Sequence, residues 1–295
     1  MFEANCIDEY LALEIISDQT FDIAAAHYIT NFVNWQKTHK DFSIFVSSSI
    51  HQRIMNNILR LYLSNTSENP DGGATPERLL NLPTSTRMFR SHGMCMIRTV
   101  INSAERSGYI AVLKGHFDRR LKVLRPTEKW IALEVDRHEL AQASLAFLTQ
   151  QRFRLASKAS GNALMARLAG VMGAELDSVG VLLGEPDDPL SSIAARDHGL
   201  TTAFAVADAW TRGALIPSNR KMGESFFIST AQVRQILGIA TNRELIAFDQ
   251  KGKIGDANEL VREIRRLVAH EFAIYFRCKA PEIESANMSH ASTTC

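Results

Sequence analysis

This sequence of 295 residues is poor in paired cysteines and in long apolar runs. Its four cysteines, Cys6, Cys95, Cys278 and Cys295, form no CxxC pair, which argues against a disulfide framework and against a cysteine-rich zinc module. No apolar run reaches the roughly 18 residues that cross a bilayer. No basic segment followed by an apolar stretch opens the chain, so we expect no signal peptide. These absences predict a cytoplasmic protein that does not enter a membrane.

Motifs for phosphate binding and for metal binding are missing as well. The pair Gly72-Gly73 lacks the Lys-Ser/Thr of a phosphate-binding loop. His92 and Cys95 have an HxxC spacing, but two ligands without a second pair nearby do not make a zinc site. The sequence therefore predicts neither a metal nor a cofactor.

Two acidic pairs, Glu134/Asp136 and Asp187/Asp188, have the composition of paired catalytic carboxylates. The first pair is expected on a helix surface and the second in a loop, where solvated charge is the better interpretation. No other combination of side chains has the spacing of a catalytic site, so we predict that the protein is not an enzyme.

The net charge of only +1 hides an uneven distribution. Residues 75–130 contain 11 Lys and Arg against 4 Asp and Glu, an excess of seven positive charges. The remainder of the chain must then carry six net negative charges. A basic segment on an acidic body predicts one face that binds a polyanion.

Apolar residues recur with a period close to 3.6 along most of the chain, which predicts a mainly α fold. Thr75 has the position of an N-cap, with Pro76 at the first helical residue. The predicted helices are Ile7–Ser17, Phe21–Gln36, Ser49–Leu63, Thr75–Leu82, Ser91–Arg106, Thr127–Leu148, Asn162–Met172, Gly199–Arg212 and Asp256–Phe276.

A β-hairpin is predicted between two of these helices. The runs Tyr109–Leu113 and Leu121–Leu124 are apolar and β-prone, and Gly115 between them is free to take a positive φ. The tip has little apolar surface to bury but several donors for phosphate oxygens. These donors are Lys114, His116, Arg119 and Arg120.

The helix before this hairpin is amphipathic and ends at Gly108, a natural residue for a helix C-terminus. If its apolar residues face inward, small polar residues and arginines form the outer face, which suits a major groove. The outer residues are Cys95, Arg98, Thr99, Asn102 and Arg106. The order of helix, glycine and two-stranded hairpin is that of a winged helix-turn-helix, whose usual function is to bind DNA.

The same segment, about residues 75–129, resembles the MarR family of bacterial regulators. In that family the recognition helix ends in L-x-x-x-G-[LWY]-[VI], the wing tip carries D-x-R, and L-T-x-x-G opens the next helix. The matching segments here are Ala104–Ile110, Asp118–Arg120 and Leu124–Lys129, with Thr75–Leu79 similar to the first helix of the reading head. The resemblance implies that Arg120 enters the minor groove and that Asp118 orients the wing by pairing with a neighbouring arginine.

The chain departs from that family in length and in the second half. MarR proteins are about half as long and dimerise through their terminal helices. Residues Ser229–Ile254 are themselves shaped like a helix-turn-helix, with Gly238 in the turn, but no basic hairpin is expected after them. We therefore predict domains at 1–150 and 151–280, a disordered tail at 281–295, and a tandem of two winged-helix-like units, the second degenerate.

Together these patterns predict a sequence-specific DNA-binding regulator of transcription whose partner is double-stranded DNA. The sequence leaves open a small-molecule effector, and either a homodimer or an internal pseudo-dimer. Two alternatives remain: a replication-initiator-like protein with tandem winged helices, and a winged-helix scaffold for protein interactions. The predicted DNA-binding residues are Arg98, Thr99, Asn102, Arg106, Lys114, His116, Asp118, Arg119 and Arg120.

Overall fold

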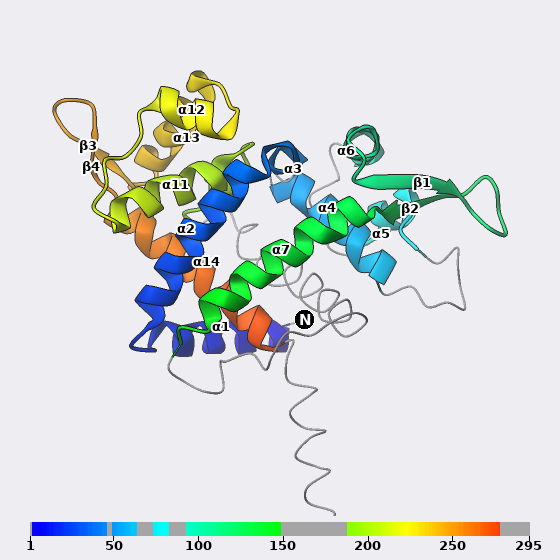
Figure 1. Ribbon diagram of the computed structural model, residues 1–295, viewed down its shortest axis with the longest axis horizontal. Helices are drawn as coiled ribbons and strands as arrows, with labels where there is room; N and C mark the ends of the chain where they lie inside the picture. Colours follow the sequence, from blue (N-terminus) through cyan, green and yellow to red (C-terminus); the bar gives the residue numbers. More distant parts are fainter. Residues whose placement is uncertain (1, 46–48, 64–72, 83–92, 149–187, 278–295) are drawn as a thin grey trace, which may run out of the picture.

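The chain is mainly helical, with two small antiparallel hairpins, which confirms a mainly α fold with a small β element (Figure 1). The computed structural model describes residues 2–45, 49–63, 73–82, 93–148 and 188–277. The predicted helix Asn162–Met172 and the tail 281–295 lie outside these residues. The N-terminal helices are α1 Phe2–Ile16, α2 Phe21–Thr38, α3 Lys40–Phe45, α4 Ser49–Leu63, α5 Pro76–Asn81 and α6 Gly93–Arg106.

The first hairpin follows α6, and a long helix follows the hairpin. Strands β1 Ile110–Lys114 and β2 Lys122–Pro126 are joined in antiparallel register, and α7 spans Glu128–Leu145. The remaining elements are α10 Ser191–Ala194, α11 Gly199–Thr211, α12 Asn219–Phe226, α13 Thr230–Asn242, β3 Ala247–Phe248, β4 Ile254–Asp256 and α14 Asn258–Arg277.

Two hydrophobic clusters organise the fold, and they do not follow the predicted division at residue 150. The first cluster, here called the head core, lies among α3–α6, the β1–β2 hairpin and the start of α7. The second, the body core, joins α1, α2 and the end of α7 to α10–α14. Phe21 of α2, for example, packs edge-on against Phe272 of α14, with ring centroids 6.5 Å apart. Helices from the two ends of the chain therefore complete one core, because neither buries its apolar face alone.

Helix α7 connects the two cores, with Trp130 in the head core and Leu145 in the body core. Thr127 caps its N-terminus by accepting a hydrogen bond from the backbone amide of Trp130. Because one helix contributes to both cores, apolar packing along it links the head to the body. Figure 1 shows α7 running from the base of the β1–β2 hairpin to α1 and α14.

A buried polar network lies along α7, and it corrects the prediction that Glu134 is solvated. The Glu134 carboxylate accepts hydrogen bonds from Trp130 Nε1 at 3.1 Å and from Arg137 Nε at 3.0 Å. Arg137 also lies 3.8 Å from Glu271 of α14, which accepts a 2.5 Å hydrogen bond from the Tyr28 hydroxyl. Burial and the Glu271 carboxylate hold the pKa of Tyr28 well above its usual range, so the phenol stays protonated.

The second acidic pair also differs from prediction where the structure describes it. The Asp188 carboxylate is buried and accepts hydrogen bonds from the backbone amide of Leu190 and from Arg266 of α14, at 2.8 and 2.5 Å. It therefore anchors α10 to α14, whereas its place in a polar loop predicts a solvated carboxylate.

The predicted turn at Gly238 is wrong. Helix α13 continues through Gly238, which lies exposed on its surface while Ile236, Leu237 and Ala240 are buried. Burial of these residues outweighs the ~1 kcal/mol by which glycine disfavours a helix. The helix before α13 is α12, and a three-residue turn in which Phe227 has a φ of 58° joins the two.

The predicted second helix of this region is replaced by a hairpin. Residues 245–254, for which the sequence predicts this helix, instead belong largely to the β3–β4 hairpin, which ends at Asp256. The helix stops because Glu244 takes a left-handed conformation, with φ of 58°, and turns the chain back toward α13. Lys251 and Lys253 lie exposed at the tip of this hairpin.

Two partly or fully buried histidines are expected to make the fold sensitive to acid. Burial lowers the pKa of His198, although Asp197 raises it, and burial also lowers the pKa of His27. The unfolded chain therefore binds more protons than the folded chain once the pH falls below the ordinary histidine value near 6.5. The free energy of unfolding is expected to be at its full value above about pH 6.5 and to fall as the pH drops below it. The total loss is about 1.4 kcal/mol for each pH unit by which folding lowers a histidine pKa.

Urea denaturation at a series of pH values between 5 and 8 tests this expectation with His198→Asn. Asparagine tolerates the left-handed backbone of residue 198, which has a φ of 58°. The variant should lose part of the decline in stability between pH 6.5 and 5. A decline as steep as that of the unchanged protein would rule out His198 as its source.

Candidate nucleic-acid interface

A tight connection between α6 and β1 sets the direction of the first hairpin. Gly108 has a φ of 74°, which glycine adopts without strain, and the backbone amide of Tyr109 donates to Ala104 O at 2.9 Å. The Tyr109 and Ile110 side chains are then buried in the head core. The sequence predicts this local order, because the signal for it lies within a few consecutive residues.

The hairpin is anchored at its base and exposed at its tip. Its five paired positions run from Ile110 opposite Pro126 to Lys114 opposite Lys122. Leu124 is buried, and its backbone amide donates to Ala74 O at 2.8 Å, so the segment before α5 pairs with β2. Apolar contacts therefore fix the base, while residues 116–120 are exposed and lie beyond the paired strands.

The loop at the tip is shaped by Asp118. Its carboxylate accepts a hydrogen bond from the backbone amide of Arg120 at 2.8 Å, and its carbonyl accepts one from Leu121 at 3.0 Å. This is the local role that aspartate commonly has in turns. Gly115 is not among the described glycines with positive φ, so it does not use the conformational freedom that glycine offers there. The loop spans seven residues, and a tight turn is not needed.

All nine predicted DNA-binding residues lie on the surface, in two neighbouring groups. Four project from α6 and five belong to the hairpin and its loop, and Figure 1 shows these elements together at one end of the molecule. The guanidinium groups of Arg98, Arg119 and Arg120 form no ion pair with any acid in the described segments. No described acid therefore neutralises their charge.

The outer face of α6 combines donors and acceptors. The Thr99 hydroxyl donates to Cys95 O at 2.9 Å within the helix, so its oxygen remains available mainly as an acceptor. Asn102 and Arg106 are exposed, one and two turns nearer the hairpin. The face thus offers amide and guanidinium groups, the two side-chain types best suited to adenine and guanine edges.

Two other basic residues of the head serve the fold. Lys129 donates to Ser107 O at 3.1 Å and lies 4.3 Å from the centre of the Tyr109 ring, so it braces the turn after α6. Arg125 lies over the ring of Tyr62, 5.9 Å from its centre. Some basic residues of the head therefore support the fold near the base of the β1–β2 hairpin, while others are exposed on α6 and at the tip of the hairpin.

Phe117 belongs to this surface and is not among the residues predicted from the sequence. It is 77% exposed at the tip, and the His116 ring packs edge-on against it with centroids 4.9 Å apart. An aromatic residue inside a short basic turn is the signal that could have identified it. Apolar side chains on such projections can enter the minor groove or pack against sugars.

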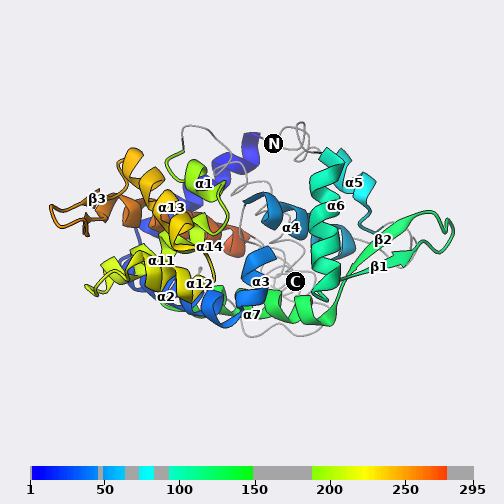
Figure 2. The ribbon, with the colours of Figure 1, turned by 90° about the horizontal axis from the view of Figure 1, so that it is seen from above.

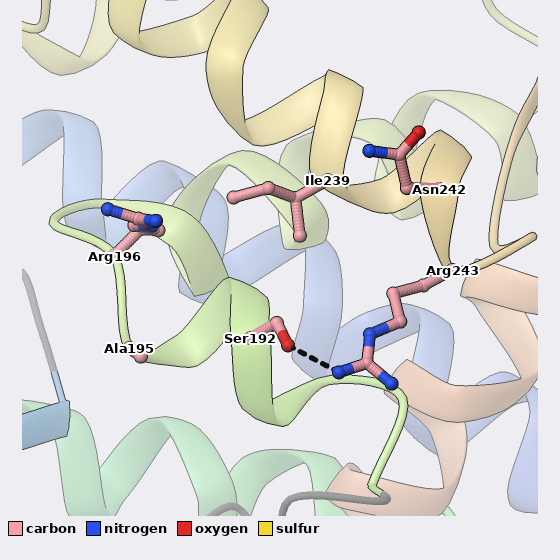
Figure 3. Close-up of a pocket in the computed structure, with 6 residues that line it drawn as sticks. All are labelled: Ser192, Ala195, Arg196, Ile239, Asn242 and Arg243. Atoms are coloured by element: carbon pink, nitrogen blue, oxygen red, sulfur yellow. Dashed lines mark hydrogen bonds between the residues drawn. The ribbon is translucent and has the colours of Figure 1, made fainter.

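A separate cavity lies in the C-terminal half, between α10 and α13, and contains none of the predicted residues (Figure 3). Its volume is about 500 Å³, and Arg243 on one side donates to the Ser192 hydroxyl at 2.9 Å. The cavity is lined by Ser192, Ala195, Arg196, Ile239, Asn242 and Arg243.

Within the described segments no three His, Cys, Asp or Glu side chains gather as metal ligands would. His92 lies outside these segments, so the HxxC pair is described only at Cys95, which is exposed. None of the described helices combines the length and the apolar character needed to cross a bilayer.

Comparisons with protein-family models, with curated protein sequences and with solved structures found no significant match. The resemblance to the MarR family accordingly depends on the motif residues of the head alone.

Proposed function

We propose that this protein binds double-stranded DNA through a winged helix-turn-helix formed by α4–α6 and the β1–β2 hairpin, and that it regulates transcription at specific sites. The observation that carries the proposal is the exposed, unpaired set of cations on α6 and on the hairpin. Arg98, Arg106, Lys114, Arg119 and Arg120 lie on adjacent elements, and the described segments supply no acid paired with any of them.

The shapes of the two elements suit the two grooves of a duplex. An α-helix is 10–12 Å across with its side chains, and the major groove is about 12 Å wide. Helix α6 would enter this groove with Arg98, Asn102 and Arg106 toward base edges and phosphates. The β1–β2 hairpin would then reach the neighbouring minor groove. There Arg120 would enter the groove, as the resemblance to the MarR family implies, and Phe117 would add an apolar contact.

A salt series tests the proposal directly. The full chain is titrated into fluorescent duplexes from a randomised pool, and binding is followed by anisotropy at 50–300 mM salt. Affinity should fall steeply with salt, and Arg119→Ala and Arg120→Ala should each reduce the slope of log K against log salt by about one, because each removes one phosphate contact.

The matched control is Arg262→Ala on α14, which removes an exposed arginine that pairs with Glu259 and Glu263 away from the head. It should leave the slope unchanged. Absence of binding at low salt, with a folded protein, would contradict DNA binding and favour the protein-interaction scaffold. Equal slopes for all three variants would contradict the role given to the hairpin.

A further inference from the structure

Helices α6 and α13 bury their side chains in the same pattern. Each buried position of α13 follows its counterpart in α6 by 136 residues, and four exposed positions have the same spacing. The buried residues Ile97, Val100, Ile101 and Ala104 correspond to Val233, Ile236, Leu237 and Ala240. The exposed residues Arg98, Thr99, Asn102 and Arg106 correspond to Arg234, Gln235, Gly238 and Asn242.

The backbone after the two helices turns in the same way. Glu244, 136 residues after Gly108, has a φ of 58°, which non-glycine residues rarely adopt. The backbone amide of Leu245 donates to Ala240 O at 2.9 Å, as Tyr109 donates to Ala104 O at 2.9 Å. Leu245 and Ile246 are then buried, like their counterparts at the start of the first hairpin.

The elements on either side of this turn also correspond. Each long helix is preceded by a short one with a hydroxyl N-cap: Thr75 accepts from Arg78 N at 3.1 Å before α5, and Ser218 accepts from Lys221 N at 3.3 Å before α12. At Gly223 of α12 a Cβ would lie 2.7 Å from Ile228 O, so this glycine permits the close turn into α13.

The tip of the second hairpin repeats the turn of the first. The Asp249 carboxylate accepts hydrogen bonds from the backbone amides of Lys251 and Lys253 at 2.8 and 2.9 Å, as Asp118 accepts one from Arg120. The ammonium groups of both lysines are exposed and pair with no acid of the described segments. The second tip therefore carries two exposed cations for which the described segments supply no acid.

The two units face the same side of the molecule. In Figure 1, α6 and the α12–α13 pair lie along the upper edge, and the two hairpins project at the right and left ends. The view from above in Figure 2 again places the hairpins at opposite ends of the long axis. One duplex laid along this edge could meet both units.

We infer that α12, α13 and the β3–β4 hairpin form a second DNA-contacting unit, so that a single chain binds two adjacent segments of one duplex. This inference rests on the proposed function of the first unit. The two reading faces differ, with Arg98, Asn102 and Arg106 on one and Arg234, Gly238 and Asn242 on the other. The binding site is therefore composed of two dissimilar half-sites, and one chain of 32.9 kDa occupies it.

The test is hydroxyl-radical footprinting of the full chain on a duplex selected from a randomised pool, combined with the salt series. The unchanged protein should protect two segments about one helical turn, or 34–36 Å, apart. Lys251→Ala/Lys253→Ala should lower the salt slope by about two and weaken protection of one segment, while Arg119→Ala/Arg120→Ala weakens the other. Sedimentation should give one chain per duplex.

The results that would contradict the second unit differ from those that would contradict the proposed function. One protected segment and an unchanged slope in Lys251→Ala/Lys253→Ala would overturn the second unit while leaving the proposed function intact. Two chains per duplex would show that both half-sites are read by the first unit of a homodimer. Loss of all binding at low salt would contradict the proposed function, and the second unit with it.

Discussion

Replacing Arg137 by alanine is expected to lower the free energy of unfolding by about 3–5 kcal/mol, because it leaves buried carboxylates without their counter-charge. The Arg137 side chain is 9% exposed and lies between Glu134, 3% exposed, and Glu271, 13% exposed. Glu271 of α14 also accepts a hydrogen bond from Tyr28 of α2, so the substitution is expected to destabilise the contacts of α2 and α14 as well as those of α7. Urea denaturation followed by circular dichroism measures the change.

The matched control for this substitution is Arg220→Ala in α12. Arg220 and Glu224 form a pair of similar geometry, 2.8 Å long, but their side chains are 83% and 62% exposed. Water compensates such a surface pair, so the urea midpoint should stay unchanged. A loss at Arg137 no greater than at Arg220 would contradict the buried link that α7 forms between the two cores.

Replacing Gly199 by alanine is expected to cost about 3 kcal/mol or more, because the new methyl group meets backbone atoms that cannot move aside. A Cβ at Gly199 would lie 1.8 Å from Ile193 O and 2.7 Å from Ile193 C. Ile193 is itself buried in the body core, and α10 is tied down through Asp188 and Arg266. Relief of the clash would require α10 and α11 to separate. Thermal and urea denaturation both report the loss.

Gly238→Ala is expected to have the opposite effect on stability, at an exposed glycine of α13. Gly238 lies inside α13 and is exposed, and no atom from outside its own helix lies within 4 Å of the place that a methyl group would take. Alanine there should stabilise the protein by about 0.5–1 kcal/mol, through the lower conformational entropy of the unfolded chain. Equal effects at the two glycines would contradict the packing of α10 against α11 or the continuity of α13.

The elements of the candidate interface were predictable because their signals are local. The cap at Thr75, the glycine at 108 and the β-prone runs of β1 and β2 each involve residues a few positions apart. The apolar period of α6 likewise identifies which of its side chains lie outside. Exposure of the nine predicted residues follows from these local rules, without knowledge of any distant contact.

Other features depend on partners far along the chain. Glu134 has the pattern of a surface acid until Arg137, Glu271 and the core around Trp130 enclose it. The sequence around Gly238 and Glu244 predicts a turn and a second helix. In the structure, one continuous helix and a hairpin bury the apolar residues of this segment instead. Exposed Phe117 is not predicted, because an apolar side chain is normally expected to be buried.

By itself, therefore, the sequence determined the mainly helical fold, the first hairpin and the cations that it displays, since dihedral preferences, caps and periodicity act within a few residues. Only the tertiary structure decided that α1 and α2 complete a core with α14, that charges are buried along α7, and that a second hairpin lies at the opposite end of the molecule. These outcomes depend on which apolar faces meet, and burial is a property of the whole chain that no local pattern contains.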